Sequence, residues 1–390
     1  MGNVPHLRFP EFSGEWKKCK LGDLCNVLMC KRILVSQTNT EDGVPFYKIG
    51  TIGSTPDAYI SKELFDDYKV KYNYPRKGEV MITCAGTVGK CVVYDGEDAY
   101  FQDSNIVWID NPTQYISNGF LFHLLSKVDW RKLNSTTIIR IYNDDLRNLK
   151  MSYPRKEEQQ KISHLLSLLD ERIATQNKII EDLKKLKSAI IENVFDDKHS
   201  ERLQLDNVGS YIRGLTYSSN DVVEHGGTLV MRSNNIVNGS LLDYNNNVVF
   251  VNKQMSAEQQ LQNGDIVICM ANGSSSLVGK SSFYDGNWHS PITVGAFCGI
   301  YRSKEPIVKW LFQTNKYRRY IWNSLQGGNG AIANLNGEDI LNMSFSIPNA
   351  PIKDTCVKML TSVDSALENN ISLCALYTLQ KQYLLRQMFI

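Results

Sequence analysis

Side chains able to contact a nucleic acid gather in stretches of this 390-residue sequence that also contain glycine and aromatic residues. Arg and Lys pair with guanine, and Asn and Gln pair with adenine, in the DNA major groove. Ser, Thr and backbone amides near glycine suit phosphates. In the first half, the candidates for DNA contacts are Lys31, Arg32, Lys48, Thr51, Thr87, Lys90, Gln102, Asn105, Arg140, Tyr142 and Asn143. In the second half they are Arg213, Thr216, Tyr217, Arg232, Asn234, Asn235, Asn272, Ser274, Ser275, Lys280, Asn329 and Asn334.

Motifs for catalysis or for a bound cofactor are missing. The glycines in 86–91 and 273–281 have the wrong spacing for a nucleotide-binding loop. The sequence also lacks a dinucleotide-binding Gly pattern and the Asn-Pro-Pro-aromatic box of amino-group methyltransferases. Its nine cysteines include no Cys-x-x-Cys pair, which argues against a zinc ribbon. We therefore expect a non-catalytic, metal-free chain with the reduced thiols of a cytoplasmic protein.

The elements that must position these side chains occur twice. Residues 77–82 match residues 263–268 at an offset of 186, and Asp145-Leu146 matches Asp339-Ile340 at an offset of 194. Each copy begins with short β-like runs separated by Gly and Asn, and a proline, Pro154 or Pro348, closes this part. The ordered series of matches indicates an internal duplication.

Corresponding loops differ in chemistry between the two copies, whereas the β-like runs and helices match. Polar, glycine-rich stretches are also what ordinary surface loops look like, and this alternative applies to any single candidate residue. A scaffold repeated with altered contact loops would nevertheless produce the observed difference between the copies.

A long helical segment follows each globular part, at about 155–195 and 351–390. The first carries a heptad seam at steps of four and three residues, formed by Ile162, Leu166, Leu169, Ile173, Gln176, Ile180, Leu183, Lys187, Ile190 and Val194. The second carries it at Cys356, Leu360, Val363, Leu367, Asn370, Cys374, Tyr377, Lys381, Leu384 and Met388. Such helices either pack on their own domains or pair with each other, and the duplication favours pairing. A helix of about 40 residues is about 60 Å long and would act as a spacer.

Charge and hydropathy exclude several classes of protein. The 43 basic and 41 acidic residues leave a net charge of +2, so a chain that grips DNA needs a partner to supply further positive charge. The sequence has no apolar run long enough for a membrane span, and its first residues do not resemble a signal peptide.

These features resemble the specificity subunit of type I restriction–modification systems. Residues 7–12 with Glu15-Trp16-Lys17 look like the common start of that family, and residues 43–50 look like its early target-domain strand. Residues 154–162, followed by the heptad helix, are similar to its central spacer. The second spacer departs from the pattern, because residues 348–354 replace the charged, Gln-rich sequence of the first.

The resemblance implies an α+β fold in which two similar globular target-recognition domains are separated by two long antiparallel coiled-coil helices, in a pseudo-twofold internal repeat. The expected boundaries are 1–153 for the first target-recognition domain, 154–196 for the central spacer helix, 197–348 for the second domain and 349–390 for the C-terminal spacer helix. Each domain would recognise one half of a split double-stranded DNA target, and the helices would fix the gap between the halves.

The resemblance also implies partners in defence against foreign DNA. Two methyltransferase (M) subunits would carry S-adenosylmethionine and methylate adenine, and restriction (R) subunits with ATP and Mg would add cleavage, with no cofactor on this chain. Leu165, Ile179 and Leu186 lie beside the heptad seam and could contact the M subunits, although burial on their own domain fits equally well. The competing interpretation is a duplicated coiled-coil scaffold that does not bind DNA.

Overall fold

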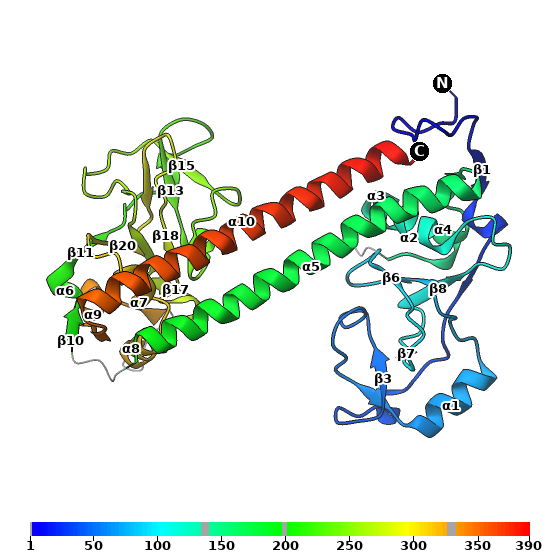
Figure 1. The fold of residues 1–390 in the computed structure, drawn as a ribbon, viewed down its shortest axis with the longest axis horizontal. Coiled ribbons are helices and arrows are strands. Elements are labelled where there is room, and N and C mark those ends of the chain that lie inside the picture. Colours follow the sequence, from blue (N-terminus) through cyan, green and yellow to red (C-terminus); the bar gives the residue numbers. More distant parts are fainter. Residues whose placement is uncertain (1, 134–139, 197–200, 326–332) are drawn as a thin grey trace. The chain divides into compact units, whose positions relative to one another are not determined.

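The computed structural model describes residues 2–133, 140–196, 201–325 and 333–390. The chain forms two compact units, shown in Figure 1. Unit 1 contains residues 1–177 and 372–390, and unit 2 contains residues 178–371. Each long helix is therefore divided between the two units, whereas the sequence-based boundaries treated the helices as separate spacers.

Unit 1 contains three small sheets. The first has the order β2 (Asn26–Leu28), β8 (Ile106–Asp110), β5 (Val80–Thr83) and β6 (Cys91–Val93). The second has the order β4 (Tyr59–Ile60), β3 (Val44–Tyr47) and β7 (Tyr100–Phe101). The third pairs β1 (Lys17–Lys20) with β9 (Lys150–Tyr153). All four residues of β5 are buried, as expected for a central strand between two neighbours.

The short helices of unit 1 are α1 (Lys62–Lys71), α2 (Asn118–Lys127), α3 (Trp130–Leu133) and α4 (Asn143–Arg147). Ser61 and Ser117 cap α1 and α2, since each side chain accepts a hydrogen bond from a backbone amide of the first turn. One core lies between the first sheet and α2, and a second, rich in aromatic residues, lies between the first and second sheets.

Unit 2 repeats this plan with a few added strands. Its largest sheet has the order β11 (Gly209–Arg213), β20 (Cys298–Ser303), β16 (Ile266–Cys269), β18 (Ser281–Phe283) and β14 (Ser240–Leu241). The next has the order β12 (Val222–Val223), β15 (Val249–Val251), β13 (Thr228–Met231) and β19 (Ile292–Val294). Two further pairs are β10 (Glu201–Gln204) with β22 (Ser344–Ile347), and β17 (Ala271–Asn272) with β21 (Ala333–Asn334). The short helices are α6 (Leu205–Val208), α7 (Val308–Leu311), α8 (Asn315–Leu325) and α9 (Gly337–Leu341).

The strand pairings confirm the duplication. The antiparallel pairs β2–β8, β5–β8 and β5–β6 of unit 1 correspond to β11–β20, β16–β20 and β16–β18 of unit 2. The parallel pair β3–β7 corresponds to β13–β19. Even the turn before β5 and β16 is shared, because Gly78 and Gly264 have φ values of +87° and +90°. Glycine suits this left-handed conformation better than any other residue.

The two long helices are α5 (Lys156–Val194) and α10 (Ala350–Met388), each of 39 residues. Every seam position expected from the sequence is buried or half-buried. The helix ends pack on the cores, with Ile162 and Met388 in unit 1 and Ile191 and Leu360 in unit 2. Within each unit the helices also contact each other, so both sequence-based interpretations hold.

Reciprocal ion pairs join the two helices. In unit 2, Lys187 of α5 binds Asp364 of α10 at 2.7 Å, and both side chains are about nine-tenths buried. In unit 1, Lys381 of α10 binds Asp170 of α5. Asp364 and Lys381 lie 194 residues after Asp170 and Lys187, so they are the repeated counterparts of these residues. The lysine comes from α5 in unit 2 and from α10 in unit 1. In unit 1, Arg172 of α5 also donates to the Tyr377 hydroxyl of α10, so a later residue of α5 contacts an earlier residue of α10 and the helices are antiparallel there.

In the part of the chain that the structure describes, no helix combines the length and apolar character needed to cross a bilayer.

Candidate nucleic-acid interface

Four of the candidate residues of unit 1 line one concavity of about 320 Å³. We call it the Lys48 pocket, and its expected members are Arg32, Lys48, Gln102 and Asn105. Asp103 joins them, and Phe46 of β3 adds an apolar wall. The strand β3 ends at Tyr47, directly before Lys48, and β7 ends at Phe101, directly before Gln102. Because β3 and β7 are parallel neighbours, their following residues emerge at the same sheet edge.

Carboxylates accompany both cations of the Lys48 pocket. Arg32 Nε lies 2.7 Å from Asp103 Oδ2, and Lys48 Nζ lies 2.9 Å from Asp57 Oδ1. These pairs are substantially solvent-exposed, with 66% of the Arg32 side chain accessible. Exposed ion pairs stabilise a fold only weakly, so they leave both cations available to a ligand at little energetic cost.

The other candidates of unit 1 mostly support loops. Thr51 Oγ1 accepts a hydrogen bond from the Lys48 amide at 3.1 Å, and Lys90 Nζ donates to the carbonyl of Ile52. Arg140 Nη1 donates to Asn105 Oδ1 at 3.2 Å. Lys90 and Arg140 therefore contribute to positioning these loops.

Three further candidates of unit 1 lie outside the Lys48 pocket, although the Tyr142 ring lies 6.0 Å from the Arg140 guanidinium. Tyr142 is 61% exposed and lies at the start of α4, directly before Asn143. Lys31 Nζ lies 5.4 Å from the centre of the Tyr72 ring. Thr87 is exposed in the turn between β5 and β6.

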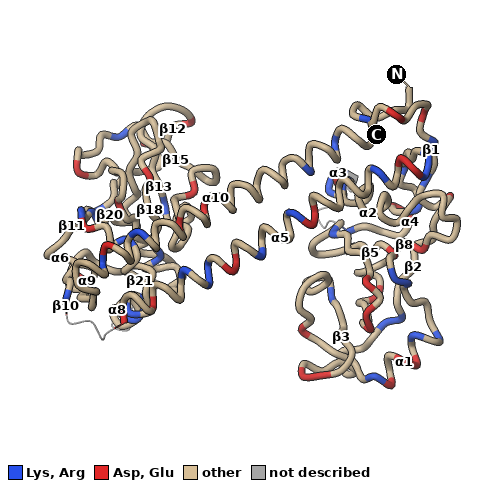
Figure 2. Tube along the Cα trace, in the orientation of Figure 1, with Lys and Arg blue, Asp and Glu red and all other residues tan. Residues whose placement is uncertain are grey.

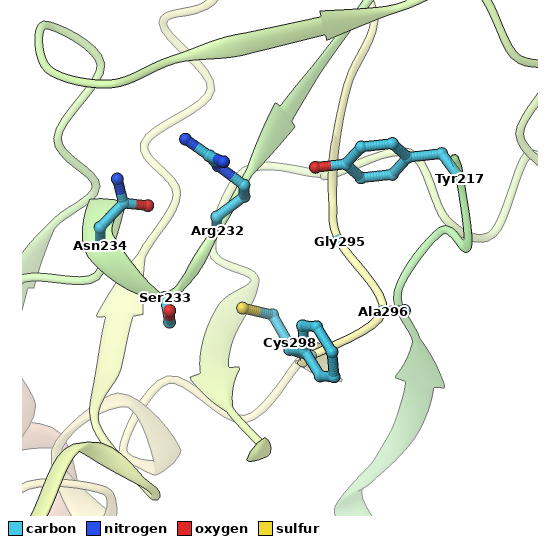
Figure 3. A pocket seen from close by; sticks show the side chains of 8 residues that line it. Tyr217, Arg232, Ser233, Asn234, Gly295, Ala296 and Cys298 are labelled. Atoms are coloured by element: carbon cyan, nitrogen blue, oxygen red, sulfur yellow. The ribbon is translucent and has the colours of Figure 1, made fainter. Parts of the chain in front are cut away.

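In unit 2, three candidates line a concavity of about 500 Å³, shown in Figure 3. We call it the Arg232 pocket. Tyr217, Arg232 and Asn234 are its expected members, and the turn Gly295-Ala296-Phe297 forms another wall. Phe297 is 65% exposed although it is a large apolar residue. Phe297 therefore adds an accessible apolar surface to the wall of the pocket.

Arg232 and its neighbour Asn235 have different roles. The Arg232 backbone amide donates to Asn235 Oδ1 at 3.0 Å, and Asn235 Nδ2 donates to the carbonyls of Asp243 and Asn246. Asn235 is completely buried. Its amide group is used to close the loop, so the sequence-based assignment of Asn235 to DNA contact does not fit this structure.

Polar residues outside the Arg232 pocket bind one of its lining residues, Ser233. Asn272 Nδ2 donates to Ser233 Oγ at 3.3 Å, and Asn272 Oδ1 accepts from the backbone amide of Ser274. Ser275 and Lys280 line a second concavity of about 260 Å³. Asn272 and Ser274 are therefore linked to the Arg232 pocket through Ser233, whereas Ser275 and Lys280 belong to the second concavity.

Helix α8 presents exposed basic and aromatic side chains that the sequence-based search missed. Arg318 and Trp322 line the same second concavity as Lys280, and Arg319 is also exposed. Figure 2 shows the basic residues of α8. The signal was present in the sequence, since residues 315–322 contain Lys316, two arginines and three aromatic residues but no acidic residue. Basic residues interleaved with aromatics are typical of contacts to a nucleic-acid backbone.

The remaining candidates of unit 2 are scattered. Arg213, Thr216 and Asn334 are exposed but are not among the residues lining the Arg232 pocket. Asn329 lies outside the described residues.

The expected partner contacts on α5 divide into two kinds. Leu165 packs against the core of unit 1. Ile179 and Leu186 are 40% and 49% exposed, respectively, so they remain accessible to a partner.

Thiols and metal ligands form no obvious centre in the described residues. No group of three or more His, Cys, Asp or Glu side chains there has the geometry to hold a metal ion. Burial raises the pKa of the Cys25 and Cys84 thiols to about 12. Protonated, buried thiols are poor nucleophiles.

Comparison with known proteins shows what this architecture is similar to. Residues 13–185 match the family model of the type I restriction modification DNA specificity domain. A protein of Haemophilus influenzae assigned as a type I restriction enzyme specificity subunit is 49% identical over 167 residues, which cover 43% of each chain. The EcoKI specificity subunit of Escherichia coli is 35% identical over 155 residues, covering 37% of this chain and 31% of that protein. The chain thus matches less than half the length of these curated relatives.

Solved structures extend the similarity in fold to the whole chain. The S subunit of a type I restriction–modification system from M. genitalium has a TM-score of 0.65 at 15% identity, and the match covers 99% of both chains. A chain from a study of complex assembly and conformational transition in a type I system has a TM-score of 0.50 at 14% identity, covering 98% of both chains. At these identities the likeness concerns the fold.

Proposed function

We propose that this chain is the DNA sequence-specificity subunit of a type I restriction–modification complex, because residues 13–185 match the family model of the type I restriction modification DNA specificity domain. It recognises a bipartite double-stranded DNA target, with one half-site for each unit, and it carries out no catalysis itself. It works in the cytoplasm as part of the defence against foreign DNA.

One observation carries this proposal: the same strand framework occurs twice, and each copy presents a concavity lined by different hydrogen-bonding side chains. Arg32, Lys48, Gln102 and Asn105 line the first, whereas Tyr217, Arg232 and Asn234 line the second. Selection for a single repeated ligand would preserve the lining residues. Two copies that recognise two different base sequences need a common framework and different contacts.

The charge of the chain supports the assignment of partners. A net charge of +2 is small for a protein that holds a long duplex alone. We propose that two methyltransferase subunits complete the DNA clamp and carry S-adenosylmethionine, and that restriction subunits carry ATP and Mg. Ile179 and Leu186 on α5 are apolar and accessible, as a contact with such a subunit requires.

The long helices support a spacing role. We propose that α5 and α10 set the number of base pairs between the half-sites, since each is one continuous helix of 39 residues that contributes to both units. At 1.5 Å per residue each is about 58 Å long. The alternative of a scaffold that does not bind DNA has no support from the family match or from the pockets.

The test is to compare DNA methylation in cells that carry or lack this chain together with its methyltransferase subunit. We expect a split methylated motif that disappears when this chain is deleted. An electrophoretic shift assay with and without the methyltransferase subunit should show specific DNA binding only by the complex. A methylation motif that persists without this chain would contradict the proposal.

A further inference from the structure

The Lys48 pocket and the Arg232 pocket occupy corresponding places in the duplicated fold. Lys48 directly follows β3, and Arg232 directly follows β13. The turn after β7 completes the wall of the first pocket, and the turn after β19 completes the wall of the second. The parallel pairs β3–β7 and β13–β19 place these segments together in the same way. Lys48 and Arg232 are therefore equivalent positions, 184 residues apart in the sequence.

The electrostatics of these equivalent positions differ. Lys48 lies 2.9 Å from Asp57, and the other cation of its pocket, Arg32, is paired with Asp103. Among the described residues, Arg232 is the cation of its own pocket, no acidic side chain lines that pocket, and none forms an ion pair with it. The Arg232 pocket therefore offers hydrogen-bond donors and positive charge without a competing carboxylate.

One contact holds the backbone of Arg232 and another orients its side chain. Its backbone amide is bound to Asn235, and its Nη2 donates to the carbonyl of Asn247 at 2.9 Å. Its Nε is buried and has no hydrogen-bond partner within the described part of the chain. A buried donor without a partner costs free energy, so Nε favours any rearrangement of the side chain that brings it an acceptor, and the Nη groups carry the donors for a ligand. In Figure 3 the hydroxyl end of Tyr217 is directed toward Arg232.

From these observations, and resting on the DNA-recognition function proposed above, we propose that Arg232 specifies one base pair of the half-site read by unit 2. Its guanidinium donates hydrogen bonds to O6 and N7 of a guanine in the major groove. Guanine is the base whose edge carries two neighbouring acceptors, which match the arginine fork. Phe297, in the same pocket, supplies an apolar surface that limits water access to this contact.

The experiment uses the full complex in cells and determines methylated motifs genome-wide for three variants. Arg232→Gln removes the charge and the fork, and Arg232→Lys keeps the charge but removes the fork. Strand β20 begins at Cys298, which lines the pocket, and ends at Ser303. Lys304 is an exposed cation that directly follows this far end of the strand, so Lys304→Gln is the matched control. A cleavage or methylation assay on oligonucleotides then measures discrimination at the affected position.

Both Arg232 variants should relax the motif at a single guanine-containing base pair of one half-site. Loss of a bidentate contact reduces discrimination about 5- to 150-fold. The other half-site and the gap should not change, and Lys304→Gln should give the original motif.

The inference is overturned if the Arg232→Lys variant keeps the original motif. That result would indicate a contact with a phosphate, which needs only a positive charge. It is also overturned if Arg232→Gln lowers methylation equally at all sites. It is overturned as well if Arg232→Gln leaves methylation unchanged, which is the result expected if the pocket binds a protein segment and not DNA. All of these outcomes leave the proposed function standing, since a split motif would still depend on this chain.

Discussion

Polar residues only three positions apart have different roles in this protein, and burial decides which. Asn235 turns inward and binds two backbone carbonyls, whereas Arg232 lines an open pocket. A buried loop carbonyl needs a donor, and an asparagine amide supplies two without the cost of burying a charge. In unit 1 the same need is met by Lys90, which binds the carbonyl of Ile52. A polar residue in a binding loop is therefore not automatically a contact to the ligand.

The exposed arginines of α8 lead to a prediction about affinity. Arg318→Gln and Arg319→Gln should weaken DNA binding by the complex to all sequences alike, because phosphate contacts carry no sequence information. Each lost contact should reduce the slope of log K against log salt by about 1. Binding titrations at several salt concentrations measure both effects, with Lys304→Gln as the matched surface control. A changed methylation motif would instead place these arginines on base edges.

His123 gives unit 1 a dependence on pH. This side chain is 1% exposed, and burial lowers its pKa from 6.5 to about 4, although nearby Asp170 opposes the shift and Lys381 adds to it. The unfolded chain takes up a proton near pH 6.5, whereas the folded chain does so only near pH 4. The contribution of His123 to the free energy of unfolding is therefore fully present above pH 6.5 and is lost as the pH falls toward 4, by up to about 3 kcal/mol.

We expect His123→Leu to flatten the loss of stability between pH 7 and pH 5. Thermal unfolding of the purified chain across this range measures the slope, and His164→Gln provides a control because His164 is an exposed histidine on α5. Equal slopes for His123→Leu and the original chain would show that His123 does not cause the acid sensitivity.

At the level of elements, equivalent ion pairs join α5 and α10 in the two units, but the two pairs differ in burial. Asp364 in unit 2 binds both Lys187 and Lys309 and accepts a hydrogen bond from the Trp310 indole at 3.1 Å. Burial alone would raise the pKa of Asp364, but the two lysines lower it below its usual value. Asp170 in unit 1 has a side chain that is 36% exposed, so its pair with Lys381 is partly screened by water.

Removing these carboxylates should therefore have unequal effects. Asp364→Asn leaves Lys187 buried without its counter-ion and should destabilise unit 2 by about 3–5 kcal/mol. Asp170→Asn should cost unit 1 considerably less. Hydrogen exchange along both helices, combined with thermal unfolding, assigns each loss to a unit.

A double variant separates the buried charge from the packing. Lys187→Met with Asp364→Leu should recover part of the stability lost in Asp364→Asn, because the buried cation is removed, whereas the Trp310 indole and Lys309 still lose their partner. If Asp170→Asn were as damaging as Asp364→Asn, burial would not be the factor that distinguishes the two pairs.

At the level of the whole molecule, the duplicated strand framework provides stability, and the loops of each unit can differ in their contacts. The strand framework is the same in both units, and each unit has its own buried cores. A unit with its own core can accept changes in its loops without disturbing the other unit. One chain can then combine two independent specificities.

Exchanging one unit should accordingly change one half-site. We expect that replacing residues 201–348 with the corresponding segment of a related protein alters a single half of the methylated motif and preserves the other half and the gap. Sequencing of methylated DNA from cells with the chimera provides the measurement. Changes in both halves would show that the two units do not recognise DNA independently.

The sequence by itself determined the duplication, the mixed α+β class and the positions of both long helices, because these depend on hydrophobic periodicity and on repeated turn glycines such as Gly78 and Gly264. It also marked the loops that contain Lys48 and Arg232. Only the tertiary structure decided which loop residues share a pocket, that Asn235 is buried, and that α8 adds Arg318 and Trp322 to the surface beside Lys280. Those outcomes depend on strands that are distant in the sequence but adjacent in a sheet, such as β3 with β7 and β13 with β19, and no local pattern encodes that pairing.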